Sequence, residues 1–246
     1  MTKVFVTLEQ VNDNQAVVLG DDAHHLRNVL RKNIGDSLLI GVDSKTFRAE
    51  IIEISEDKVV CELMEPVTIS AESPLKTTLY QAVAKGDKMD LIIQKAVELG
   101  VSEIVPFFSR HTVVKLTKDK QHQRQQRWQK IAESAAKQCK RDLIPTIHVP
   151  HSFEEVKSKL AVRTGDHLLL MAYELAEEQT LKDLTALDPQ HVSMIIGPEG
   201  GFSQDEAEAV QSLGGEIIKL GNRILRTETA AITVLALVQF LWGDLG

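Results

Sequence analysis

The chain has 246 residues, enough for one large domain or two smaller ones with a substantial core. With 43% hydrophobic and 26% charged residues, its composition is that of a globular protein, and no apolar run reaches the about 20 residues that a bilayer span needs. No apolar signal block follows Met1, and Cys61 and Cys139 stand alone without metal-ligand spacing. We therefore expect a reduced, metal-free cytoplasmic protein that does not enter a membrane.

The net charge of −7 argues against a protein that is basic overall. Basic residues are nevertheless concentrated between Lys115 and Arg141, where only Asp119 and Glu133 oppose them. Because local charge matters more than total charge for binding a polyanion, this segment is compatible with RNA binding but does not prove it.

The first part of the chain predicts a small β-barrel. Alternating apolar and polar residues, broken by turn residues, predict strands at residues 4–8, 15–19, 37–42, 47–54 and 58–64. A short helix is predicted at 21–31, with Arg27 and Arg31 an i,i+4 step apart on one face. Two such arginines can contact successive phosphates, although on an arbitrary surface helix they are more often simply solvated.

Proline-containing segments at 65–66 and 71–74 predict a linker, which divides the chain into domains 1–72 and 73–246. In the second domain strand and helix patterns alternate, as in a parallel sheet covered by helices on its faces. The predicted strands are 77–82, 103–107, 147–149, 167–172, 194–196 and 216–220, and the predicted helices are 89–99, 121–141, 152–160, 204–213 and 228–242.

Two glycine-containing loops follow buried strands near the end of the chain. The first is Gly197-Pro198-Glu199-Gly200-Gly201, after which Ser203 and Glu206 form a capping box that opens the next helix. The second contains Gly221-Asn222-Arg223. Neither loop is a G-x-G-x-x-G or P-loop motif. Loops at the ends of buried strands can hold a small ligand, and ordinary turn glycines are an equally good interpretation.

Two motifs carry a resemblance to a known family. IGPEGGF followed by LGNRILRTETA is similar to the paired signature of the SPOUT RNA methyltransferases, and specifically of the RsmE family. The segments HHLRNVLR and LYQAVAKGDKMDLIIQKAVELGVSEIVPF also resemble this family. Its pattern usually has proline where this chain has Asn222.

The resemblance implies a SPOUT-type α/β trefoil-knot methyltransferase domain preceded by a PUA-like β-barrel. It implies methylation, dependent on S-adenosyl-L-methionine, of N3 of a specific uridine in 16S rRNA of the small ribosomal subunit, by a homodimer. The last helix, apolar almost all round, would be buried within one subunit or would form the dimer interface. Alternatives are a transfer RNA or ribose 2′-hydroxyl target, and an RNA-binding module whose loops serve only as turns.

The same resemblance implies site residues. The cofactor would lie among Leu170, Met171, Ala172, Ile196, Gly197, Glu199, Gly200, Gly201, Leu220, Gly221, Ile224, Leu225, Arg226, Thr229 and Ala230. The RNA would contact His25, Arg27, Arg31, Lys85, Arg110 and Arg141, the last matching a basic position of the family without a catalytic role.

Uridine N3 carries a proton, so its methylation requires a general base or a cation that stabilises the anionic ring. Arg226 is the candidate cation. Glu199 is a candidate catalytic carboxylate, for which a structural role is equally well supported. Glu228 is better explained as a first-turn carboxylate favoured by the helix dipole. The sequence does not identify the base.

Overall fold

The computed structural model describes residues 1–67, 70–162, 165–176 and 179–246. The chain folds into two compact units. The first comprises Met1–Glu72 together with Ala136–Ile144, and the second comprises Ser73–Ala135 together with Pro145–Gly246. Segment 136–144 thus joins the first unit, although it lies beyond the predicted linker in sequence.

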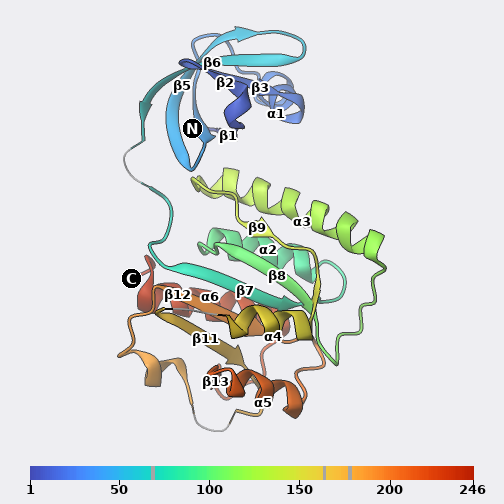
Figure 1. Ribbon diagram of the computed structural model, residues 1–246. Helices are drawn as coiled ribbons and strands as arrows, with labels where there is room; N and C mark the ends of the chain where they lie inside the picture. Colours follow the sequence, from blue (N-terminus) through green and yellow to red (C-terminus); the bar gives the residue numbers. More distant parts are fainter. Residues whose placement is uncertain (68–69, 163–164, 177–178) are drawn as a thin grey trace. The chain divides into compact units, whose positions relative to one another are not determined.

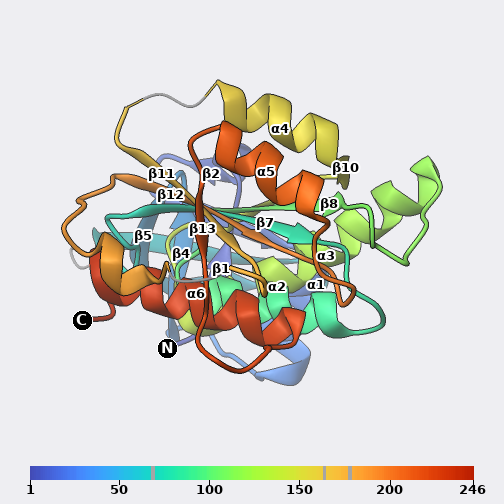
Figure 2. The same ribbon diagram turned by 90° about the horizontal axis from the view of Figure 1, so that it is seen from below.

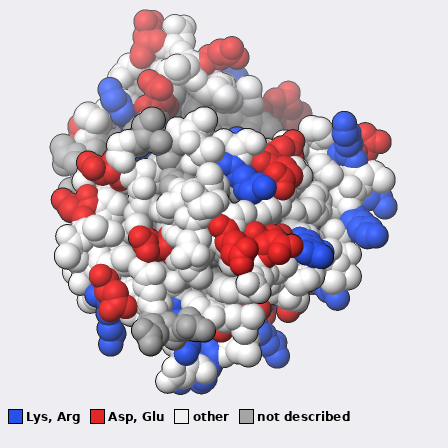
Figure 3. All heavy atoms as spheres, turned by 60° about the horizontal axis from the view of Figure 1, so that its bottom comes forward, with Lys and Arg blue, Asp and Glu red and all other residues white. Residues whose placement is uncertain are grey.

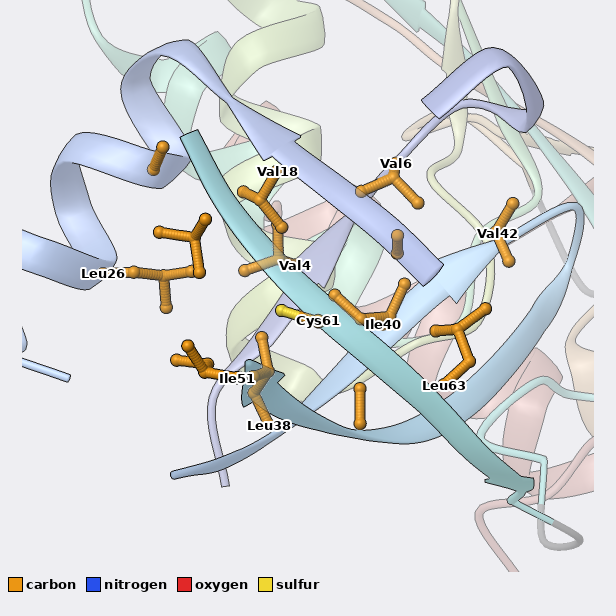
Figure 4. Packing of buried hydrophobic residues seen from close by; sticks show 14 residues of the cluster. Val4, Val6, Val18, Leu26, Leu38, Ile40, Val42, Ile51, Cys61 and Leu63 are labelled. Atoms are coloured by element: carbon orange, nitrogen blue, oxygen red, sulfur yellow. The ribbon is translucent and has the colours of Figure 1, made fainter. Parts of the chain in front are cut away.

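The first unit is built on a six-stranded sheet in the order β1-β4-β5-β6-β3-β2, antiparallel except for the β1–β4 pair. Its strands are β1 Lys3–Phe5, β2 Val11–Asn12, β3 Gln15–Leu19, β4 Ser37–Val42, β5 Lys45–Ile54 and β6 Lys58–Pro66. Alternation along β5 buries Ala49 and Ile51 and exposes Arg48 and Glu50. Figure 4 shows side chains of β1, β3, β4, β5 and β6, with Leu26, converging on one core.

Two predictions for the first unit are wrong in detail. The first strand ends at Phe5, because the short 3₁₀ helix η1 Leu8–Gln10 follows it. The predicted helix 21–31 is α1 Gly20–His24 followed by the π turn η2 His25–Val29. Arg31 lies beyond the helix end with φ 50°, so Arg27 and Arg31 do not form a regular i,i+4 pair.

The second unit contains a seven-stranded sheet, all parallel as predicted, in the order β10-β8-β7-β12-β11-β13, with β9 also pairing with β8. Its strands are β7 Lys76–Ala82, β8 Glu103–Phe108, β9 Thr146–Ile147, β10 His151–Ser152, β11 His167–Ala172, β12 His191–Ile196 and β13 Glu216–Ile218. Since the strands are parallel, their carboxyl ends meet at one edge of the sheet.

Helices cover both faces of this sheet, with α2 and α6 on one face and α4 and α5 on the other (Figure 2). The helices are α2 Lys88–Glu98, α3 Lys118–Cys139, α4 Phe153–Ala161, α5 Gln204–Ser212 and α6 Thr227–Trp242, with the 3₁₀ helix η3 Leu181–Leu184 between β11 and β12 (Figure 1). The sequence patterns did not indicate η3 or β10. No helix among the described residues is long and apolar enough to span a membrane.

The last helix is only partly buried. Ala231, Val234, Leu235 and Val238 are enclosed, whereas Phe240 is 61% exposed and Leu237 40% exposed. The apolar side chains of α6 therefore lie on two faces with different surroundings. One face is buried against the rest of the chain, and the other is exposed to solvent.

Candidate active site

A pocket of about 510 Å³ opens at the carboxyl edge of the parallel sheet. Its walls are the segments that follow β11, β12 and β13, together with the first residues of α2 and α6. Of the predicted cofactor residues it is lined by Ala172, Ile196, Gly197, Glu199, Gly201, Leu220, Gly221, Ile224, Leu225, Arg226 and Ala230.

Four predicted cofactor residues do not line the pocket. Leu170 and Met171 are fully buried within β11, where neighbouring strands and helices enclose them. Gly200 faces His111, since a Cβ added there would meet the His111 Cβ at 3.0 Å. Thr229 is exposed on α6. The two loops are thus brought together as predicted, but not every residue in them faces the cavity.

The first loop requires glycine at position 201 because of its backbone conformation. Gly201 adopts φ 68°, a conformation that disfavours other residues, and its N–H donates to the Pro198 carbonyl at 3.0 Å. A Cβ at Gly201 would also meet the Glu174 Oε1 atom at 2.0 Å. The predicted capping box then starts α5, with the Glu206 carboxylate accepting the Ser203 N–H at 2.9 Å.

A buried hydrogen-bond chain fixes this loop against α6. The Thr227 hydroxyl donates to the Gly197 carbonyl at 2.6 Å, and the Gln81 side-chain amide donates to the Thr227 hydroxyl at 2.9 Å. Gln81 and Thr227 are both buried, on β7 and α6 respectively. The chain therefore couples three elements that are far apart in sequence.

The second loop, residues 219–226, forms the opposite wall and ends at the N-terminus of α6. Gly221 has φ 100°. Arg226 is the N-cap residue of α6, and its backbone carbonyl accepts the Ala230 N–H at 2.8 Å. Its side chain is exposed and lines the pocket, as the proposed cation requires.

Lys88 forms an ionic bridge that the sequence did not indicate. Its Nζ lies 3.0 Å from Glu199 Oε1 and 3.4 Å from Glu228 Oε2, and it lines the pocket itself. The Lys85 backbone N–H also donates to Glu199 Oε1, at 3.1 Å. The bridge therefore connects the start of α2, the first glycine loop and the start of α6.

This bridge affects the protonation of Glu199. Burial favours the neutral acid, but hydrogen bonds from backbone N–H groups and from Lys88 outweigh it and lower the pKa of the Glu199 carboxyl. The hydrogen bond to Glu199 in turn raises the pKa of Lys88. A carboxylate held in this way is a weak proton acceptor, so the geometry favours the structural interpretation of Glu199.

The predicted RNA-binding residues differ in their availability. His25, Arg31, Lys85 and Arg110 are exposed, and the Arg110 guanidinium contacts Asp205 at 2.9 Å. Arg27 donates to the carbonyl oxygens of Ser55 at 3.0 Å and Glu56 at 2.6 Å. On the face drawn in Figure 3, acidic side chains lie beside basic ones, so that face presents no continuous basic surface.

Arg141 is not available as predicted. It is 4% exposed, and its guanidinium donates to the Glu72 carboxylate from Nε at 3.2 Å and from Nη2 at 2.5 Å. Glu72 also accepts the backbone N–H groups of Asp142 and Leu143. Its burial and its ion pair with Glu72 argue against an RNA contact by Arg141 and favour a structural role within the first unit.

Nine pocket residues were not among the predicted cofactor residues, namely Lys88, Tyr173, Glu174, Pro198, Phe202, Lys219, Asn222, Arg223 and Thr227. For three of them the sequence contained a signal that could have been used. Tyr173 and Glu174 directly follow the predicted strand 167–172, and Lys88 ends the loop after the predicted strand 77–82. Among the described residues, no group of three or more histidine, cysteine or acidic side chains could hold a metal ion.

The comparisons with known proteins agree with this architecture. Residues 71–239 match the RNA methyltransferase domain family, and residues 18–64 match the RNA methyltransferase PUA domain family. Ribosomal RNA small subunit methyltransferase E of Bacillus subtilis (strain 168) is 32% identical over 249 residues, covering 98% of this chain and 96% of that protein. The protein of the same name from Buchnera aphidicola subsp. Acyrthosiphon pisum is 34% identical over 235 residues, covering 94% and 90%.

Solved structures show the same likeness. The ribosomal RNA small subunit methyltransferase E of Neisseria gonorrhoeae, bound to S-adenosyl methionine, superposes with a TM-score of 0.86 at 29% identity, covering 100% of each chain. A Legionella pneumophila methyltransferase in complex with the bound cofactor SAM superposes with a TM-score of 0.88 at 33% identity, covering 99% of this chain and 98% of that chain.

Fold and pocket together define an RNA methyltransferase with an additional PUA domain. The chain belongs to the ribosomal RNA small subunit methyltransferase E family. The predicted fold class, a SPOUT-type α/β-knot domain with a PUA-like domain, is confirmed.

Proposed function

We propose that this protein transfers a methyl group from S-adenosyl-L-methionine to N3 of a specific uridine in 16S rRNA. The observation that carries the proposal is the pocket at the carboxyl edge of the sheet, walled by two glycine loops and lined by Arg226. The relatives named as ribosomal RNA methyltransferases, and the neighbour bound to S-adenosyl methionine, support it.

The pocket fits the proposed cofactor. Gly201 has φ 68°, and a Cβ at Gly197 would meet the Phe202 ring at 3.0 Å, so the shape of this wall depends on glycine at both positions. Backbone amides and carbonyls of residues 196–201 and 220–225 are available to hold a nucleoside and an amino acid moiety. When bound, the cofactor supplies an electrophilic methyl group on a sulfonium.

The residues of the chain would contribute positioning and charge. The N3–H of uridine must lose its proton before nitrogen becomes a good nucleophile, and a nearby cation stabilises the resulting anion. Arg226 is the candidate for this role, because its side chain is exposed to the cavity and has no ion pair among the described residues. Glu199 and Glu228 are both engaged by Lys88, so neither is assigned as the base.

We assign RNA binding to residues 1–72 and methyl transfer to residues 73–246. His25, Arg27 and Arg31 in the first region, and Lys85 and Arg110 in the second, are the proposed phosphate contacts. Reversing the charges of Arg27 and Arg31 should weaken RNA binding and reduce its salt dependence. An unchanged slope of affinity against salt concentration would refute their role.

We also propose that the protein acts as a cytoplasmic homodimer. The exposed apolar side chains of Leu237 and Phe240 on α6, and of Leu91 on the adjacent helix α2, support an interface with a second copy. Phe240→Asp should shift the mass measured by light scattering from dimer to monomer. An unchanged mass would place the interface elsewhere.

The decisive experiment is mass spectrometry of 16S rRNA nucleosides from cells lacking the protein, beside wild-type cells. Loss of one 3-methyluridine, restored by purified protein with labelled cofactor, would establish the reaction and the modified atom. An unchanged level of 3-methyluridine would contradict the proposal and direct the search to transfer RNA or ribose methylation. Naked RNA and isolated small subunits tested side by side would show which is the substrate.

A further inference from the structure

Basic residues outnumber acidic residues in the lining of the pocket. Four basic side chains contribute to its walls, those of Lys88, Lys219, Arg223 and Arg226, but only two carboxylates, those of Glu174 and Glu199. Such a lining attracts anions, including the phosphates of RNA and a ligand carboxylate. A cationic ligand would be repelled unless a carboxylate in the wall faced it.

Glu199 is poorly suited to that task. Its Oε1 already accepts hydrogen bonds from Lys88 Nζ at 3.0 Å and from the Lys85 N–H at 3.1 Å. Lys88 also reaches Glu228 at 3.4 Å. Both glutamates are therefore engaged by the single positive charge of Lys88.

Glu174 is in a different situation. It follows β11 by two residues, is exposed, and forms neither an ion pair nor a hydrogen bond with any residue that the structure describes. Its Oε1 lies against the α-carbon of Gly201, where an added Cβ would come within 2.0 Å. The carboxylate thus lies over the first glycine loop, and glycine at this position leaves room for it.

We infer that Glu174 recognises a positive charge of the sulfonium cofactor and so selects S-adenosylmethionine in a pocket that is otherwise mostly basic. The inference rests on the proposed function, because that function supplies the ligand. S-adenosylmethionine carries two cationic groups, the sulfonium and the α-ammonium of its methionine moiety. Glu174 offers the ammonium a charge-assisted hydrogen bond and offers the sulfonium, which has no N–H to donate, the electrostatic attraction of a carboxylate.

The test is isothermal titration calorimetry of the full chain with three ligands. S-adenosylmethionine has both cations, S-adenosylhomocysteine keeps only the ammonium, and 5′-methylthioadenosine keeps the nucleoside and a neutral sulfur but lacks the amino acid. The variant is Glu174→Gln, which preserves the shape of the side chain beside Gly201. The matched control is Glu208→Gln, which removes one carboxylate from the exposed surface of α5 outside the pocket.

Glu174→Gln should weaken S-adenosylmethionine binding by about tenfold or more and leave 5′-methylthioadenosine within about twofold, as one charge-assisted contact is lost. Loss for S-adenosylmethionine alone identifies the sulfonium as the recognised group. Equal loss for S-adenosylhomocysteine identifies the ammonium. Glu208→Gln should change none of the three affinities.

Two results would overturn the inference while the wild-type protein still binds S-adenosylmethionine. One is unchanged binding of all ligands by Glu174→Gln. The other is equal weakening of all three, which would assign the contact to the ribose or adenine instead of to a charge. If the wild-type protein binds no S-adenosylmethionine at all, the proposed function fails, and the inference fails with it.

Discussion

Replacing Lys88 with methionine should destabilise the second unit measurably. The substitution keeps most of the aliphatic side chain but leaves Glu199 and Glu228 without the cation that lies 3.0 Å and 3.4 Å from them. An exposed ion pair stabilises by at most about 1 kcal/mol, whereas an uncompensated, largely buried carboxylate costs more. The side chain of Glu228 is only 13% exposed and those of Lys88 and Glu199 about one third exposed, so we expect a total loss of about 2 kcal/mol.

For a chain of 246 residues this loss corresponds to a decrease in Tm of roughly 4–8 °C, measured by scanning calorimetry at pH 7. Lys95→Met is the matched control, because Lys95 pairs with Glu98 on the exposed surface of the same helix. That variant should change Tm by less than about 2 °C. Lys88→Arg should retain most of the stability.

The pH dependence gives an independent check. In the folded protein the pKa of Glu199 is lowered, so its contribution to stability is present above the ordinary value of 4.5 and is lost as the pH falls through the lowered pKa. The difference in Tm between the wild-type protein and Lys88→Met should therefore become smaller below pH 4.5. Equal Tm values for Lys88→Met and Lys95→Met at pH 7 would refute the assigned role of the bridge.

Three further predictions address other residues. Arg226→Ala should reduce methyl incorporation by about 100-fold or more while cofactor affinity changes only a few-fold, and normal turnover would exclude Arg226 as the stabilising cation. Arg141→Met should lower the free energy of unfolding by about 3 kcal/mol, because it leaves the largely buried Glu72 carboxylate without its cation; the double variant with Glu72→Gln should recover part of that loss in urea titrations. The hydrogen bond from His148 is the main cause that lowers the pKa of Glu103 to about 2, so the stability that Glu103 contributes is present above its ordinary value of 4.5 and lost between that pH and 2. Thermal melts of Glu103→Gln should differ from wild-type melts at pH 7 and converge with them toward pH 2.

Local patterns determined much of the fold. Strands β4 and β11 have the predicted bounds, and the Ser203–Glu206 capping box opens α5 as predicted. Alternating apolar residues, continuous apolar runs and capping residues act over a few neighbouring positions, so the sequence displays them directly. The two loop motifs likewise predicted the segments that wall the pocket, because parallel strands place their carboxyl ends together.

Other features depended on contacts between residues distant in sequence. The π turn at η2 moved Arg31 off the helix face expected for it, and burial against Glu72 converted Arg141 from an expected RNA contact into a structural cation. Nor could element spacing indicate a knot, since chain connections are normally unknotted.

The sequence by itself determined most strands of the parallel sheet, the two glycine loops and their family signature. Only the tertiary structure decided which charges in the pocket are compensated. Folding brings Lys88, Glu199 and Glu228 together from three separate segments. Glu174, by contrast, has no basic partner among the described residues. The physical reason is that the strength and availability of a charge depend on burial and on partners that folding brings together, and no local pattern records them.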